Sequence, residues 1–204
     1  MKIDEKNLRD ILRKYRLIES LDEIPNFREY DVSEICNLSH LFGGMRNLKD
    51  ISALSSWDVS NCEDFNTMFG YCKLLKDISP LSSWDVSKSL NMDSMFAACE
   101  SLQDISPLSS WDVSECSNLK GIFGYCKSLQ DISPIASWDV SNVIKFDYMF
   151  YHCESLKDIS PLASWDVSSG LDFTHMFEGC PIRDFSVLRH WKPSKNAIIC
   201  YDQK

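Results

Sequence analysis

A unit of 27 residues that repeats along the chain constrains its fold more than any other feature. The stretch that begins at Trp57, WDVSNCEDFNTMFGYCKLLKDISPLSS, is followed directly by WDVSKSLNMDSMFAACESLQDISPLSS. A fixed period of this length predicts a solenoid, because each turn can bury its apolar face only against its neighbours. Copies begin at Tyr30, Trp57, Trp84, Trp111, Trp138 and Trp165, and the last copy is one residue shorter and ends before Trp191.

Three columns of equivalent residues run through the copies, numbered here from position 1 at the tryptophan. Position 1 holds tryptophan, with Tyr30 in its place in the first copy; position 13 holds Phe42, Phe69, Phe96, Phe123, Phe150 and Phe177; position 16 holds Cys72, Cys99, Cys126, Cys153 and Cys180. We therefore expect one domain over residues 1–204. It divides into an N-terminal helical cap and half repeat (1–29), six repeats (30–190) and a C-terminal cap (191–204).

The apolar pattern inside each copy predicts the local structure of one turn. Positions 9, 12, 13 and 16 are apolar, the spacing of a helix with one buried face, so we expect a short helix over positions 5 to 16 with the serine at position 4 as its N-cap. Short strands are expected at the Trp-Asp-Val and Asp-Ile-Ser steps. The predicted fold class is an α/β repeat solenoid, similar to leucine-rich repeats, with about six stacked turns.

Both ends of such a stack need covers, because an isolated turn cannot bury enough surface to fold. Residues 4–16 have the pattern of an amphipathic helix, and Glu23, Ile24 and Phe27 match positions 21, 22 and 25 as a half copy. The segment NAIICYDQK is expected to add a final strand at the other end.

The motifs WDVSN and MFxxCxSLxDIS, with the proline that follows, resemble those of the BspA-type leucine-rich-repeat proteins, a bacterial group that often occurs on the cell surface. The resemblance covers Tyr30 to Trp191. It implies a leucine-rich-repeat solenoid and a role in binding or adhesion, without a shared catalytic residue.

Charge and motif content exclude several classes of function. The net charge of −9, with scattered basic residues, disfavours direct binding of nucleic acid. The N-terminus has no continuous apolar run, so we expect no membrane span and a cytoplasmic protein, with a surface location as the alternative from the resemblance. Neither a phosphate-binding glycine loop nor an organised nucleophile is present, so we expect no enzyme and no cofactor.

The position-16 cysteines share a face with phenylalanine and methionine, which favours small core residues over ligands. Zinc ligands usually come in close pairs such as CxxC, which this chain lacks. Stacked cysteines also have parallel Cβ directions, which disfavours disulfides. We expect reduced thiols and no metal site.

Two columns of aspartate form acidic ladders, in which stacked like charges repel. The repulsion is removed if backbone N–H groups bind each carboxylate, if Ca²⁺ bridges neighbouring turns, or if a basic partner docks on them. Position 2 holds Asp31, Asp58, Asp85, Asp112, Asp139 and Asp166, and position 21 holds Asp50, Asp77, Asp104, Asp131, Asp158 and Asp184.

Positions that vary between copies are not held by the core and mark a candidate binding face. Position 15 offers Tyr71, Tyr125 and His152, with Tyr148 and Tyr151 nearby. Exposed aromatic residues beside mixed charge are typical of protein-binding surfaces, although the tyrosines would also serve merely to cover helix ends.

These observations predict a non-catalytic module that presents a rigid surface to a protein partner. The alternative is an acidic decoy or inhibitor that occupies a basic groove, and a weaker alternative is a surface adhesin stabilised by calcium. Self-association through the ends of the stack is a further expectation.

Overall fold

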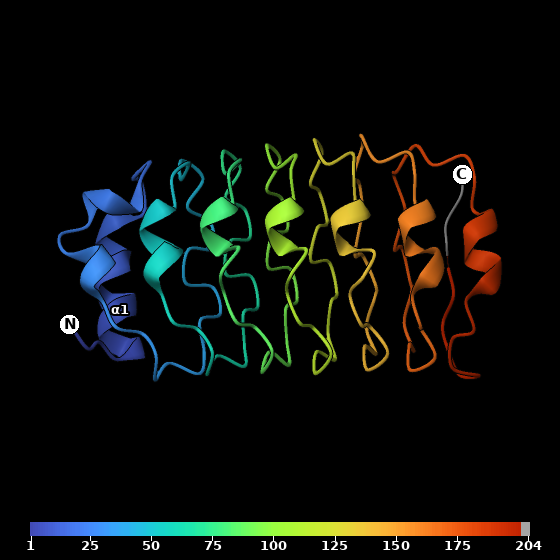
Figure 1. The fold of residues 1–204 in the computed structure, drawn as a ribbon. Coiled ribbons are helices and arrows are strands. Elements are labelled where there is room, and N and C mark those ends of the chain that lie inside the picture. Colours follow the sequence, from blue (N-terminus) through green and yellow to red (C-terminus); the bar gives the residue numbers. More distant parts are fainter. Residues whose placement is uncertain (201–204) are drawn as a thin grey trace.

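The computed structural model describes residues 1–200 and forms an elongated solenoid in which successive copies are stacked side by side (Figure 1). Within these residues α1 (Glu5–Leu12) is the one α-helix, and it lies at the N-terminal end. Each copy adds one short 3-10 helix near positions 23 to 27, and these helices form a row along the solenoid. The 3-10 helices are η1 (Arg13–Tyr15), η2 (Leu21–Glu23), η3 (Phe27–Glu29), η4 (Ser52–Ser56), η5 (Ser79–Leu81), η6 (Ser106–Leu108), η7 (Ser133–Ile135), η8 (Ser160–Ser164) and η9 (Ser186–His190).

Positions 5 to 16 are not helical in any copy, so the prediction of a helix there was wrong. In the second copy the N–H groups of Met68 and Cys72 donate to the carbonyl oxygens three residues before them, at 3.0 and 3.1 Å, as in β-turns. Thr67 and Tyr71, the third residues of two such turns, have φ of 53° and 64°. Linked β-turns also return side chains to one face every three or four residues, which explains the helix-like apolar spacing.

The serine at position 4 is accordingly not a helix N-cap. Its backbone N–H donates instead to the aspartate at position 2, as between Ser60 and Asp58 at 3.0 Å. This bond shapes a corner of the solenoid turn.

Adjacent turns pair through their backbones over positions 8 to 15, as parallel strands do. The N–H groups of Phe65 and Phe69 donate to carbonyl oxygens of the following turn at 2.9 Å each. Position 8 forms a parallel bridge from turn to turn. The bridged residues are Asn37, Asp64, Asn91, Asn118, Lys145, Asp172 and Ile198. At the steps predicted as strands, isolated parallel bridges occur only in the first copy among the described residues, from Asp31 to Lys2 and from Asp50 to Ser20, and no strand forms.

The core consists of files of equivalent side chains that run through the stack. Neighbouring position-13 phenylalanine rings have centroids 5.4 to 6.0 Å apart. The tryptophans are buried, and the indole N–H of Trp111 donates to Leu81 O in the preceding turn at 3.1 Å, which satisfies a polar group inside the core. Position 6 is a further buried column that the sequence did not reveal, because its residues differ: Ile35, Cys62, Ser89, Cys116, Val143 and Gly170.

The N-terminal segment covers the first turn. Asp4 caps α1 by accepting from Asn7 N at 2.8 Å, and the buried face of the helix packs on the core. Arg9 donates to the carbonyl oxygens of Asn37 and Ser39, and Arg16 donates to that of Gly43. In later copies these carbonyl positions accept from the preceding turn, so the two arginines replace a missing turn.

At the C-terminal end the described chain adds a further pairing segment. Phe173 N donates to Ile198 O at 2.9 Å, and His175 N donates to Cys200 O at 3.0 Å. The indole of Trp191 stacks on that of Trp165 with centroids 6.4 Å apart. Residues 201–204 of the predicted C-terminal cap lie outside the described residues.

Candidate functional site

Every aspartate of the two acidic ladders accepts a hydrogen bond from a backbone N–H two residues on. Typical distances are 3.0 Å from Ser114 N to Asp112 and 2.8 Å from Ser106 N to Asp104. The same bond occurs at Asp31, Asp58, Asp85, Asp139 and Asp166 in the position-2 ladder and at Asp50, Asp77, Asp131, Asp158 and Asp184 in the position-21 ladder. This geometry is the one that the backbone interpretation predicted. All twelve aspartates remain exposed and present negative charge outward.

The acidic ladders predict how stability depends on pH. The hydroxyl and the backbone N–H of the serine two residues on lower the pKa values of Asp85, Asp139 and Asp166. A carboxyl with a lower pKa in the folded state stabilises it above the unfolded pKa of about 3.9 and loses this contribution as pH falls through the folded pKa. We expect the urea midpoint to be constant above about pH 5 and to fall below about pH 4. A rise below pH 4 would instead show that repulsion along the ladders dominates.

The position-16 cysteines lie in the core, and each thiol donates to the carbonyl oxygen at position 13 of the preceding turn. Cys99 Sγ lies 3.2 Å from Phe69 O, and Cys126 Sγ lies 3.2 Å from Phe96 O. Burial raises the pKa values of Cys72 and Cys126 to about 12, so these thiols stay protonated. None of the five position-16 cysteines forms a disulfide. Their geometry fits the expected core role.

Thiol alkylation at neutral pH should therefore follow exposure, because the thiolate is the nucleophile. We expect exposed Cys36 to react first and half-buried Cys180, whose pKa is lowered by its interaction with the neighbouring Cys153 thiol, to react next. Cys99 and Cys126 should react only on unfolding. Peptide mapping of a labelling time course measures this order, and early modification of Cys99 in folded protein would contradict it.

Over residues 1–200 there is no group of three or more His, Cys, Asp or Glu side chains that converges as metal ligands. The same part of the chain has no helix of the length and apolarity needed to cross a bilayer.

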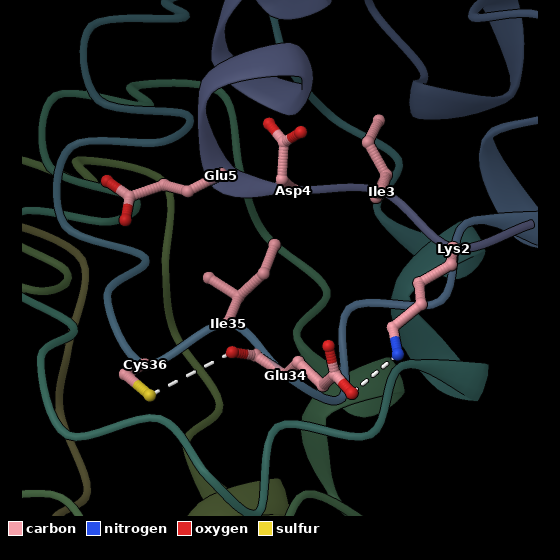
Figure 2. A pocket seen from close by; sticks show the side chains of 7 residues that line it. All are labelled: Lys2, Ile3, Asp4, Glu5, Glu34, Ile35 and Cys36. Atoms are coloured by element: carbon pink, nitrogen blue, oxygen red, sulfur yellow. Dashed lines mark hydrogen bonds and ion pairs between the residues drawn. The ribbon is translucent and has the colours of Figure 1, made fainter.

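A hollow of about 600 Å³ lies between the N-terminal segment and the first copy. Lys2, Asp4 and Glu5 line one side, and Glu34 and Ile35 line the other (Figure 2). Lys2 pairs with Glu34 across it, and this contact joins the N-terminus to the first copy. Its polar groups do not converge on a common point, and we do not assign it as the site.

Four of the five predicted binding residues form one aromatic cluster on the surface. The Tyr125 ring stacks on His152 with centroids 5.3 Å apart and planes 3° apart, and it meets Tyr151 edge to face at 5.1 Å. Tyr148 packs against Tyr151 at 5.2 Å. His175, which the sequence did not single out, joins the cluster 5.1 Å from Tyr148. The sequence indicated this placement in one way: His175 occupies position 11 of its copy, as Tyr148 does.

Tyr71, the fifth predicted residue, faces this cluster across a shallow groove of about 370 Å³. The floor consists of small residues from the third and fourth copies, so the groove exists because large side chains are absent there. We call it the aromatic groove; its lining consists of Tyr71, Ser94, Ala97, Lys120, Gly121, Gly124, Tyr125, Tyr148 and Tyr151.

Most of these aromatic residues occupy backbone positions that suit glycine. Tyr71, Tyr125, Tyr148 and His152 have φ between 53° and 64°. Glycine fills equivalent positions in other copies, as at Gly121 with φ of 55°. A bulky residue in this region costs about 1 kcal/mol or more, and such strain concentrates at functional sites.

One half-buried ion pair lies at the groove. Lys120 Nζ lies 2.9 Å from Asp147 Oδ2, and the Asp147 side chain is only 6% exposed. The same ammonium lies 5.6 Å from the centre of the Tyr148 ring. The hydrogen bond to Asp147 raises the pKa of Lys120. Neither Lys120 nor Asp147 was identified from the sequence, because they belong to adjacent copies and only the stacking brings them together.

The fold and the groove define the class of this protein as a repeat solenoid with a shaped aromatic surface. The chain belongs to the family described as Mycoplasma protein of unknown function, DUF285, whose model matches residues 9–133 and 103–197. This family is related to the BspA-like repeat proteins. Comparison with curated proteins gives no match.

Proposed function

We propose that this protein is a non-catalytic interaction module that binds a protein partner through the aromatic groove. The observation that carries the proposal is the placement of Tyr71, Tyr125 and Tyr148 at positive φ around a floor of small residues. Glycine at these positions would serve the fold about equally well, as it does at Gly121 with φ of 55°. The tyrosines therefore supply something that the scaffold does not need.

Preorganisation is the proposed mechanism. The groove is attached to turns that are hydrogen-bonded to both neighbours, as Tyr125 N is to Tyr151 O at 2.6 Å. Binding then does not include the entropy of ordering this surface. Tyrosine adds large contact area with few rotatable bonds, and such residues dominate many interfaces.

Affinity capture with quantitative mass spectrometry tests the proposal. The combined variant Tyr71→Ala, Tyr125→Ala and His152→Ala should lose a partner that the wild-type protein retains, with little change in melting temperature. The matched control is Leu90→Ala with Leu171→Ala, because both leucines are exposed and lie away from the groove. Equal capture by both variants would reject the groove as the binding face, and so would loss of capture together with loss of folding.

The exposed acidic ladders favour a second candidate, an acidic decoy that occupies a basic groove of its partner. Their carboxylates form two rows along the solenoid, and the chain carries a net charge of −9. An interface of this kind should weaken steeply as ionic strength rises, whereas one anchored by tyrosine should change little. Capture at low and moderate salt distinguishes the two.

For the fold, we infer that this solenoid is a relative of the BspA-type leucine-rich-repeat architecture. Support comes from Trp, Val, Phe, Cys and Leu columns in register and from parallel backbone pairing between turns at position 8. An experimental structure that lacked these parallel bridges would reject the inference.

A further inference from the structure

The row of residues at position 15 has a gap, because the third copy lacks a large side chain there. Tyr71 belongs to the second copy and Tyr125 to the fourth, and between them the third copy has Ala98. Adjacent paired chains are about 4.8 Å apart, so the two tyrosines stand about 10 Å apart along the solenoid. On the other side of Tyr125 the row continues without a gap, because Tyr125 and His152 stack directly. The gap is thus a property of one copy.

The rings beside this gap offer open faces. Tyr71 is 52% exposed and Tyr125 is 43% exposed, which is high for aromatic residues of an otherwise well-packed chain. Ala97 and Gly124 line the groove beside them, and Ala98 itself is buried. A side chain that enters the aromatic groove therefore meets aromatic rings, small residues such as Ala97 and Gly124, and the side chain of Lys120.

Charge around the groove favours a cation. In the position-10 row, Asp93, Lys120 and Asp147 occupy successive copies, so two carboxylates flank Lys120, whose ammonium is the charged group that lines the groove. Lys120 is already paired with Asp147 and lies over the Tyr148 ring, which leaves the row with a net negative charge. The whole chain adds a net charge of −9. An anionic partner would meet repulsion here, and a cationic one attraction.

We propose that the aromatic groove binds an arginine side chain presented by an extended segment of the partner. This inference rests on the proposed function and names the chemistry that the groove recognises. Guanidinium is planar, stacks on aromatic faces and is more weakly hydrated than ammonium, so it suits the faces of Tyr71 and Tyr125 better than lysine does. The contact of Lys120 with Tyr148 shows that a ring of this cluster accepts a cation.

Fluorescence anisotropy with labelled peptides tests the proposal directly. The probes are short Gly/Ser peptides with one central arginine, lysine, glutamate or citrulline; citrulline matches the shape of arginine but is neutral. We expect the arginine peptide to bind about 5-fold more tightly than the citrulline peptide, with lysine between them and glutamate weakest. Equal binding of arginine and citrulline would overturn the proposal.

A variant that fills the gap provides the sharper control. Ala98 has φ of 56°, close to the values at Tyr71 and Tyr125, so its backbone can accept Tyr as theirs does. Ala98→Tyr should continue the row of rings and close the groove while it adds aromatic surface. We expect it to weaken arginine-peptide binding by about 5-fold, and the Leu90→Ala, Leu171→Ala control to leave binding unchanged. Unchanged binding in Ala98→Tyr contradicts insertion into the groove.

Different results would reject the proposed interaction module and the proposed recognition of arginine. If partner capture depends on Tyr71 and Tyr125 but arginine peptides bind no better than citrulline peptides, the interaction module stands and the arginine chemistry is wrong. If capture is also independent of these tyrosines, both are wrong. Should Ala98→Tyr not fold, as its melting curve will show, Tyr71→Ala takes its place and must weaken arginine-peptide binding for the proposal to stand.

Discussion

Replacing Phe123 with alanine should lower the free energy of unfolding by about 3–5 kcal/mol, the range for a large aromatic residue removed from a core. Phe123 is fully buried, and its ring lies between Phe96 and Phe150 at 6.0 and 5.9 Å. It also meets Trp138 at 6.5 Å. Alanine would remove contacts with both neighbouring turns at once. In a solenoid each turn is stabilised only by its neighbours. A destabilised fourth copy therefore weakens the coupling between the copies before it and the copies after it.

Urea unfolding followed by tryptophan fluorescence measures this effect, with Phe177→Ala as the matched comparison. Phe177 belongs to the same file but to the last copy, where Phe150 stacks on it and Phe185 packs against it edge to face. We expect a smaller loss for Phe177→Ala, and a shallower or two-step transition for Phe123→Ala. Equal losses with equal cooperativity would show that the chain unfolds as one unit without regard to position.

Replacing Tyr71 with glycine should separate binding from stability. The substitution relieves the cost of a bulky residue at φ of 64°, about 1 kcal/mol, but increases the entropy of the unfolded chain by a similar amount. We therefore expect the free energy of unfolding to change by less than about 0.5 kcal/mol. Binding to the partner should fall by about 30-fold, the loss of one aromatic anchor of about 2 kcal/mol.

Thermal melting and a binding isotherm on the same preparations provide the two measurements. Tyr15→Gly serves as a control of the residue type, because Tyr15 lies at the end of η1 with no positive φ and packs against the core. That variant should lose stability and retain the binding surface. If Tyr71→Gly were as destabilising as Tyr15→Gly, Tyr71 would have a structural role, and the argument from backbone conformation would be wrong.

The stacking of the copies could be predicted from the sequence because it depends on columns that are chemically uniform. Phe at position 13 and Trp at position 1 recur in register, and both columns are buried files. The local path of each turn could not be predicted in this way. Positions 11 and 15 require positive φ, yet they carry Thr67, Tyr71 and Tyr148 as well as glycine. The residue types that usually mark such turns are missing from most copies, so the spacing resembled that of a helix.

The candidate site, too, could be predicted from the sequence only in part. Tyr71 and Tyr125 were identified because they vary in a column that faces outward, and variation between stacked copies is visible in one sequence. The floor of the groove was missed, since Gly121 and Gly124 carry no side chain that indicates a surface feature. The Lys120–Asp147 pair was missed because its members belong to adjacent copies, and only the stacking brings them to 2.9 Å.

The arginines of the N-terminal segment also restrict how two molecules can meet. A second molecule that tried to add its last turn to the first turn of this one would need the carbonyl oxygens of Asn37, Ser39 and Gly43, which Arg9 and Arg16 already occupy. Unpaired backbone edges are where chains join into fibrils, and a charged side chain over the edge prevents this. Head-to-tail polymerisation through this end would therefore require α1 to detach first.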